Sequence, residues 1–174
     1  MKFWHPYNLI LLLWAVSASC ADNAPRMRTM PPQPAPEIAA MEAVNQHLTE
    51  KDKDIIEAFI RRKNWTMPYY PDGYYAMLLK EGQGTAVREG SQVELRCTIR
   101  LLNGTLCYAP HNRNIVIGRT NDITGLHTAL LNLKKGAEAR FVFPPHLAYG
   151  LTGDRNKIPP RVILLFEVEL LNVS

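Results

Sequence analysis

The sequence lacks three features, and each absence argues against a class of protein or site. Its net charge is small, +4 over 174 residues, and its lysines and arginines are scattered, so the basic stripe of a nucleic-acid-binding protein is missing. The histidines show no metal-ligand spacing with one another or with the cysteines, so we expect no metal and no cofactor. The apolar run Leu9 to Val16 is shorter than the roughly 20 residues that a membrane-spanning helix needs.

What is present is enough apolar material for one domain with short appendages, since 47% of the residues are hydrophobic. Residues 1–19 are typical of a secretory signal peptide, with a charge at Lys2, an apolar run, and small residues before Cys20. We prefer this interpretation to a membrane-spanning helix because a polar segment containing Asp22 and Asn23 follows at once.

The small residues Ser17, Ala18 and Ser19 lead directly into Cys20 and resemble the lipobox of bacterial lipoproteins. The resemblance implies that Cys20 is diacylated and becomes the mature N-terminus. Two acyl chains would anchor the protein stably to a membrane. We therefore expect a protein that is lipid-anchored to a membrane of the cell envelope and faces the periplasm. A cleaved, soluble periplasmic form is the alternative, because Ser17 stands where a lipobox usually has leucine.

Two segments separate Cys20 from the main domain. Residues 20–36 carry five prolines and predict an extended tether. Residues 37–72 predict a helical N-terminal extension, in which Thr49 followed by Asp52 is similar to a capping box that opens a helix. The apolar face of that helix is expected to consist of Ile55, Ile56, Phe59 and Ile60.

Residues 73–174 predict an antiparallel sheet with one helix. Strict alternation from Val93 to Leu101 is typical of a half-buried strand with Cys97 pointing inward, and Asn103-Gly104 predicts a hairpin. The return strand is expected at 105–108, followed by an irregular link. Further strands are expected at 74–79, 115–117, 139–143 and 162–171, and a helix from Leu126 to Lys135 that ends at Gly136.

Seven short motifs in this part of the chain together resemble an FKBP-type peptidyl-prolyl isomerase domain, over about residues 73–174. They are Gly90-x-x-Val93, Leu102-Asn103-Gly104-Thr105, Ile123-x-Gly125-Leu126, Lys135-Gly136-x-x-Ala139, Pro144-Pro145-x-Leu147-Ala148-Tyr149-Gly150, Ile158-Pro159-Pro160 and Leu165-Phe166-x-Val168-Glu169-Leu170-Leu171. The resemblance implies an α+β fold in which a curled antiparallel sheet wraps around a short central helix. Residues 45–65 look like the N-terminal extension of membrane-anchored isomerase lipoproteins, including the gliding-motility-associated ones.

The family resemblance also implies a pocket and a mechanism. The loop at 146–160 would overhang a shallow apolar pocket, with the Ile123 N–H and the Tyr149 hydroxyl hydrogen-bonding a peptide. The residues expected to contact the proline ring are Leu126, Ile158 and Phe166. Rotation about an X-Pro bond meets a barrier of ~18–20 kcal/mol from amide resonance. An apolar pocket that excludes water and holds a twisted ring favours the transition state, without nucleophile or metal.

Several pocket positions depart from the family pattern. Cys97 and Cys107 stand where the family has aromatics, Tyr108 matches the pocket aspartate, Arg113 matches another aromatic and Leu126 a tryptophan. Cys97, Cys107 and Tyr108 are therefore expected to help form the substrate-binding surface. For the two cysteines we expect a structural disulfide first, with two buried thiols or a redox-dependent pocket as alternatives.

The expected function is a peptidyl-prolyl cis-trans isomerase that assists the folding of exported envelope proteins, with proline-containing polypeptides as partners. The substituted pocket leaves open a catalytically weakened binding module of the same fold, acting as a chaperone or assembly factor. An envelope structural lipoprotein with an idle pocket is a third interpretation.

Overall fold

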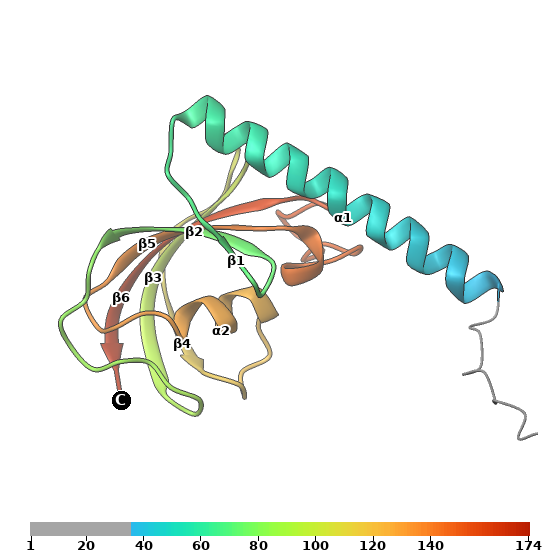
Figure 1. Ribbon diagram of the computed structural model, residues 1–174. Coiled ribbons are helices and arrows are strands. Elements are labelled where there is room, and N and C mark those ends of the chain that lie inside the picture. Colours follow the sequence, from blue (N-terminus) through green and yellow to red (C-terminus); the bar gives the residue numbers. More distant parts are fainter. Residues whose placement is uncertain (1–35) are drawn as a thin grey trace, which may run out of the picture. The chain divides into compact units, whose positions relative to one another are not determined.

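A curled antiparallel sheet of six strands forms the frame of the protein (Figure 1). The structure, a computed structural model, describes residues 36–174; the expected signal peptide, Cys20 and the tether before Pro36 lie outside the described residues. The strands lie in the order β1-β2-β5-β6-β3-β4, and every neighbouring pair is antiparallel. Their bounds are β1 Tyr69–Tyr70, β2 Tyr74–Lys80, β3 Gln92–Leu101, β4 Leu106–Val116, β5 Glu138–Phe143 and β6 Leu164–Val173. The expected α+β fold class is confirmed.

The sheet has an apolar layer on each face, because successive side chains of a strand point to opposite sides. One layer surrounds α2 (Thr124–Leu130), and the other lies under α1 (Pro36–Lys63). In β2, β5 and β6, the side chains packed with α2 are Tyr74, Phe141, Phe143, Leu164 and Phe166. The side chains between them, packed with Ile56, Phe59 and Ile60 of α1, are Tyr75, Val142 and Leu165. Alternate side chains of the same strands thus pack against α2 on one face of the sheet and against α1 on the other.

Helix α1 is longer than the sequence indicated and runs without interruption through Thr49. It begins at Pro36, whose fixed φ suits a first helical position. Thr49 is not a cap: its hydroxyl donates to the Asn45 carbonyl oxygen at 2.9 Å, a bond within the helix. Of the expected apolar face, Ile55 is 52% exposed, whereas Ile56 is buried against the sheet. Within residues 36–174, no helix has the length and apolarity to cross a membrane.

Strand β4 is one continuous strand from Leu106 to Val116, so the expected irregular link at 109–114 is wrong. Pro110 misled the prediction because proline cannot donate a ladder hydrogen bond. It is tolerated here because β4 lies at the edge of the sheet.

Helix α2 ends at Leu130, so the expected extension to Lys135 is also wrong. Residues 133–135 instead hydrogen-bond to the loop before β3: Val87 N–H donates to the Leu133 carbonyl, and Lys135 N–H donates to the Thr85 carbonyl. Gly136, with φ of 86°, lies in the turn into β5 and is not the end of the helix. Tertiary hydrogen bonds therefore compete successfully with the helical pattern of the segment.

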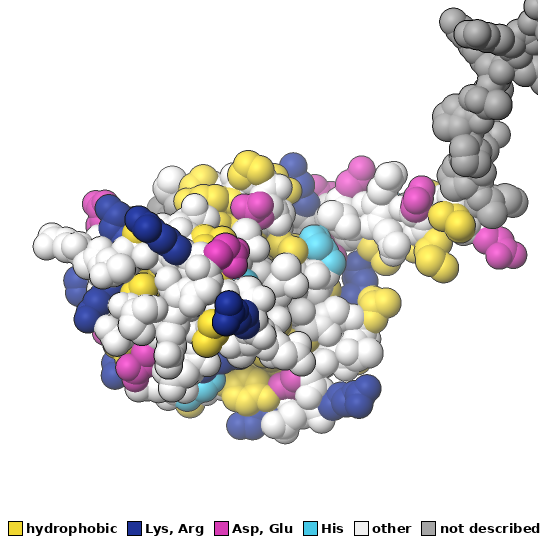
Figure 2. Space-filling view, turned by 90° about the horizontal axis from the view of Figure 1, so that it is seen from below, with side chains coloured by type: hydrophobic (Ala, Val, Ile, Leu, Met, Phe, Trp, Pro, Cys, Tyr) yellow, Lys and Arg dark blue, Asp and Glu magenta, His cyan; other side chains and the backbone are white. Residues whose placement is uncertain are grey.

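The charged side chains of the domain are mixed in sign. On the face shown in Figure 2, lysines and arginines lie among aspartates, glutamates and hydrophobic side chains, without a single basic stripe.

Candidate functional site

The loop between β5 and β6 carries Tyr149, and Asp154 organises this loop from within. Asp154 Oδ1 accepts the N–H of Asn156 at 2.9 Å and that of Ile158 at 2.8 Å. The Tyr108 hydroxyl of β4 donates to the other carboxylate oxygen. Burial alone would raise the pKa of Asp154, but these hydrogen bonds outweigh it and hold that pKa below its usual value. The carboxylate is therefore ionised at neutral pH and joins the loop to the edge strand.

The end of the loop near β6 is joined to α1. Arg161 Nη2 lies 3.3 Å from Asp52 Oδ2, and Asp52 is buried in the helix face that meets the domain. The Arg161 N–H also donates to the Gly150 carbonyl at 2.9 Å, next to Tyr149. The helix of the N-terminal extension thus helps to fix the segment on which Tyr149 lies.

A cavity of about 620 Å³ opens beside this loop. Two of the residues that the family resemblance assigns to peptide binding, Ile123 and Tyr149, line it. Most of the other lining residues are polar, namely Arg113, Asn121, Asp122, Thr124 and Thr152. The remaining two are Ala148 and Gly153. The cavity therefore has hydrogen-bonding groups in plenty and little apolar surface.

The residues expected to contact a proline ring do not line this cavity. Leu126 and Phe166 are 0% exposed and Ile158 is 2% exposed, all within the core around α2. Cys97 and Cys107 belong to the same core. Tyr108 is half-buried, and its hydroxyl is engaged by Asp154, so its contacts are those of a loop anchor. A proline ring could reach Phe166 or Leu126 only if the side chains above them moved.

An ion pair occupies the region where the family has an aromatic side chain. Arg113 Nη2 donates to Asp122 Oδ2, and the two side chains are 21% and 4% exposed. Arg113 Nη1 is buried and has no nitrogen or oxygen partner among the described residues. Burial opposes the charge on Arg113, but the Asp122 carboxylate outweighs it and raises the pKa of the guanidinium. The guanidinium is therefore charged at every physiological pH.

Asp122 also takes the hydrogen bond that a substrate would need. Its Oδ1 accepts the N–H of Ile123 at 2.7 Å, the donor that the resemblance assigns to the bound peptide. A substrate carbonyl must therefore displace this carboxylate. The Tyr149 hydroxyl, in contrast, is available to a substrate. Burial raises its pKa, with Arg113 opposing, so the hydroxyl is protonated at neutral pH and can donate a hydrogen bond.

The expected disulfide is not formed, and Cys97 and Cys107 are buried free thiols. Cys97 faces His111 across the β3–β4 ladder, whereas Cys107 lies between Leu106 and Tyr108, which face Arg100 and Ile99. The two cysteines are thus on different strands and offset by two to three residues, on the order of 8 Å along the ladder, which already exceeds the ~7 Å between Cα atoms that a disulfide tolerates. Burial is the main cause that raises the pKa of both thiols. The inward direction expected for Cys97 is confirmed, with 0% exposure.

Two aspartates for which the sequence predicted no role, Asp122 and Asp154, organise this site together with Asp52, which was expected in a capping box. Asp52 precedes Ile56 by one helical turn, so its position on the buried face was readable. Asp154 stands two residues before Asn156, in the spacing of an Asx turn. The pairing of Arg113 with Asp122 had no local signal, because it depends on how β4 approaches the start of α2.

Comparison with known proteins identifies the class to which this fold and site belong. Residues 83–171 match the model of the FKBP-type peptidyl-prolyl cis-trans isomerase family. The chain is 37% identical over 102 residues to FK506-binding protein 1 of Debaryomyces hansenii, a match that spans 56% of this chain and 91% of that protein. The chain belongs to the FKBP-type peptidyl-prolyl cis-trans isomerase family.

Two further proteins are similar to parts of this chain. The crystal structure of FkpA from Escherichia coli matches 78% of this chain and 63% of its own, with a TM-score of 0.62 and 28% identity. The inactive peptidyl-prolyl cis-trans isomerase FKBP6 of Mus musculus is 31% identical over 100 residues, which span 55% of this chain and 31% of that protein. The proteins similar to this chain thus include one named as an isomerase, FkpA of Buchnera aphidicola, and one named as inactive.

Proposed function

We propose that this protein is a peptidyl-prolyl cis-trans isomerase of low turnover, which binds proline-containing segments of exported envelope proteins at the cavity beside Tyr149. The proposal rests on the position of Tyr149 and Ile123, which line one cavity of about 620 Å³ and both lie within the residues that match the family model. The low turnover follows from Asp122, which holds the Ile123 N–H, and from the burial of the apolar side chains.

The proposed mechanism needs only the chain's own residues. The Tyr149 hydroxyl donates to a substrate carbonyl and orients the peptide across the cavity. The Ile123 N–H does the same once Asp122 has turned away. Since the planar X-Pro amide is favoured by water, removal of water around the imide lowers the barrier to rotation. The charged Arg113–Asp122 pair retains water at the mouth, so only part of this effect is available.

The decisive experiment measures the cis-to-trans rate of a short proline peptide with the full chain and with Tyr149→Phe. We expect acceleration above the uncatalysed rate, reduced several-fold in Tyr149→Phe because one hydrogen bond of about 1 kcal/mol is lost. The matched control is Tyr69→Phe, which removes a hydroxyl from a 51% exposed ring outside the cavity and should change nothing. Equal rates in wild-type protein and Tyr149→Phe would contradict the assignment of the site.

The second candidate is a binding module without turnover, and the bond between Asp122 and the Ile123 N–H favours it. Such a module would suppress the aggregation of an unfolded, proline-rich client without accelerating isomerisation. A folded sample that binds a proline peptide but leaves its isomerisation at the uncatalysed rate would establish this candidate in place of the first.

We propose that the protein acts at the periplasmic face of a membrane, anchored through a lipid on Cys20, as in the isomerase lipoproteins that residues 45–65 resemble. Residues 1–19 would then be the signal peptide and 20–36 the tether. Incorporation of labelled fatty acid into wild-type protein and its absence in Cys20→Ser would support the anchor. A soluble, unlabelled wild-type protein would favour the alternative of a cleaved periplasmic form.

A further inference from the structure

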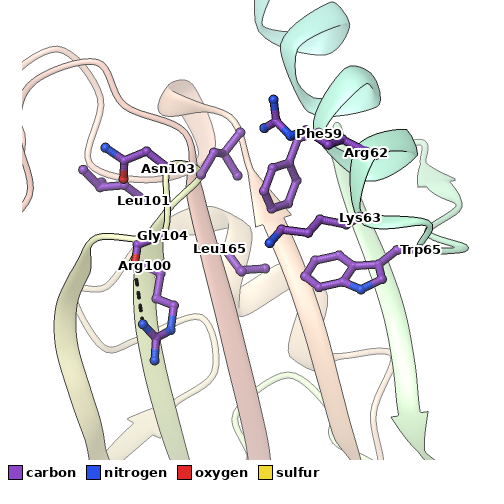
Figure 3. A pocket seen from close by; sticks show the side chains of 10 residues that line it. Phe59, Arg62, Lys63, Trp65, Arg100, Leu101, Asn103, Gly104 and Leu165 are labelled. Carbon is purple, nitrogen blue, oxygen red and sulfur yellow. Dashed lines mark hydrogen bonds between the residues drawn. The ribbon is translucent and has the colours of Figure 1, made fainter.

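A second concave site lies at the other end of the domain, between the last turn of α1 and the β3–β4 hairpin. It encloses about 470 Å³, within the size of a ligand site, and shares no lining residue with the cavity beside Tyr149. Its lining side chains come from two parts of the chain, Phe59, Arg62 and Lys63 from α1 and Arg100 and Asn103 from the hairpin region, and Figure 3 shows Leu165 between these two groups. Six of its ten lining residues precede or flank the family motifs, whereas Leu102, Asn103, Gly104 and Leu165 belong to them.

The local sequence explains why α1 ends here in an aromatic wall. Asn64 has a left-handed backbone, φ 55°, and ends the helix, as asparagine does readily. The chain then turns back, so that the Trp65 ring meets the Phe59 ring edge-on, with centroids 5.6 Å apart. The Arg140 guanidinium lies over the outer part of this wall, 4.7 Å from the Trp65 ring centroid. These contacts fix Trp65 beside the cavity, with the buried side chains of Phe59 and Leu165 as its apolar floor.

Three cations line the cavity and no acidic residue does. The charged groups of Arg62 and Lys63 lie 5.8 and 5.9 Å from the centroid of the Phe59 ring, close to the floor of the cavity. No carboxylate of residues 36–174 lies within ion-pair distance of either group. Arg100 lies 4.0 Å from Glu167, a carboxylate already bound by Arg140 at 2.9 Å. The helix end contributes only about half a negative charge. The cavity therefore has a surplus of positive charge.

We propose that this cavity binds a short acidic segment of a partner polypeptide, with carboxylates on Arg62, Lys63 and Arg100 and an apolar side chain on the floor between Trp65 and Leu165. Charge complementarity argues for the acidic groups, and the mixed lining argues for a peptide that has both kinds of side chain. A membrane surface is less suitable, because a flat array of headgroups cannot enter a concavity whose cations lie around an aromatic floor. The site would let the protein hold a client or an assembly partner while the cavity beside Tyr149 acts on another segment.

The test uses the full chain and a fluorescent dodecapeptide in which glutamates alternate with leucine and phenylalanine and which contains no proline. Fluorescence anisotropy should show saturable binding that weakens as salt is raised. The same peptide with glutamine in place of glutamate should bind at least about tenfold more weakly, since each charge-assisted contact contributes on the order of 1.4 kcal/mol. Arg62→Gln combined with Lys63→Gln should weaken binding of the acidic peptide by a similar factor.

The matched control is Arg61→Gln, which removes a cation from the same turn of α1 but outside the cavity, where Arg61 lies 3.8 Å from Glu57. It should leave binding unchanged, and circular dichroism should show that all variants are folded. Equal losses in Arg61→Gln and in the double variant would overturn the proposal, because they would indicate diffuse charge attraction. Binding to phosphatidylglycerol vesicles with none to the peptide would overturn it in favour of a membrane contact. The isomerase rate on an uncharged proline peptide tests the other cavity and should be the same in all these variants.

Discussion

Arg161 and Asp52 form an ion pair, with 3.3 Å between Nη2 and Oδ2, that connects the end of the Tyr149 loop to helix α1. The two partners differ in environment: the Asp52 side chain is 8% exposed, and the Arg161 side chain is 35% exposed. Removal of the arginine would therefore leave a buried charge unpaired, whereas removal of the aspartate leaves a cation that water can reach. This asymmetry governs what each substitution should do.

We expect Arg161→Met to lower the free energy of unfolding by about 2–3 kcal/mol at pH 7, because Asp52 then lacks its partner while the aliphatic stem is retained. Burial already raises the pKa of Asp52, with Arg161 and His146 opposing, and the variant should raise it further. A raised pKa means that the folded state binds the proton more tightly than the unfolded state. The stability contributed by the protonated acid is present below pH ~3.8 and is lost as the pH rises through the folded pKa. The deficit of the variant should thus be small near pH 4 and grow toward pH 7.

Urea unfolding at both pH values measures this effect, and Arg155→Met is the matched control. Arg155 is also an arginine with a left-handed backbone in the same loop, φ 59° against 52° for Arg161, but it is exposed and none of the described ion pairs includes it. Asp52→Asn should change stability at pH 7 by less than about 1 kcal/mol, since the amide resembles the neutral acid. A deficit in Arg161→Met that did not change between pH 4 and pH 7 would contradict the role given to Asp52.

Gly153 permits the tight course of the same loop, and Gly153→Ala should disrupt it. Its φ is 66°, and an added Cβ would lie 2.2 Å from the Ile158 carbonyl oxygen, which cannot move without breaking its bond to the Asp154 N–H. We expect the free energy of unfolding to fall by at least about 2 kcal/mol, from strain and displaced backbone. Gly150→Ala is the control, because its φ of 59° is similar but nothing lies within 4 Å of an added Cβ. Gly150→Ala should lower the free energy of unfolding by about 1 kcal/mol, measured by the same urea unfolding. Equal decreases in the two variants would show that the contact with Ile158 is unimportant.

The fold was predictable from the sequence because its signals are local and repeated. Alternation in β3 and β6 and the hairpin residues at Asn103-Gly104 depend on neighbours in the chain, and the structure contains each of these features. The errors occurred where contacts with distant segments of the chain determine the secondary structure. Helix α2 stops short because residues 133–135 bond to the loop before β3, and Pro110 lies inside a strand because that strand is at an edge. The site was less predictable for the same reason: the Arg113–Asp122 pair joins β4 to the start of α2, and neither residue reveals its partner.

Restoring an apolar cavity should increase turnover. In Arg113→Phe combined with Asp122→Val, the Ile123 N–H is free and the charged pair no longer retains water at the mouth. We expect the isomerisation rate of a proline peptide to rise about tenfold, which corresponds to one hydrogen bond of about 1.4 kcal/mol recovered in the transition state. Stopped-flow or protease-coupled measurement of the cis-to-trans rate gives the result directly.

The single variant Arg113→Phe and a surface ion pair serve as controls for the double variant. Arg113→Phe alone leaves the Asp122 carboxylate buried and unpaired, so it should lower the free energy of unfolding by about 3–5 kcal/mol. Arg96→Gln with Glu169→Gln removes an exposed ion pair with a 3.0 Å contact and should alter neither rate nor stability by much. If the double variant at Arg113 and Asp122 is folded but its rate is unchanged, then Asp122 does not limit turnover.

The two buried thiols should be inert in the native protein. Burial raises the pKa of Cys97, against the attraction of Arg113, and it raises the pKa of Cys107, so the reactive thiolate fraction at pH 7.5 is smaller than in a free cysteine, whose pKa is ~8.5. We expect iodoacetamide at that pH to leave both residues unmodified in folded protein and to alkylate both in urea, as read by mass spectrometry of the peptides. Peptide binding and isomerisation should be the same with and without reductant. A peptide pair joined through Cys97 and Cys107 in a non-reducing digest would contradict the strand register, because the two residues would have to be neighbours across the ladder.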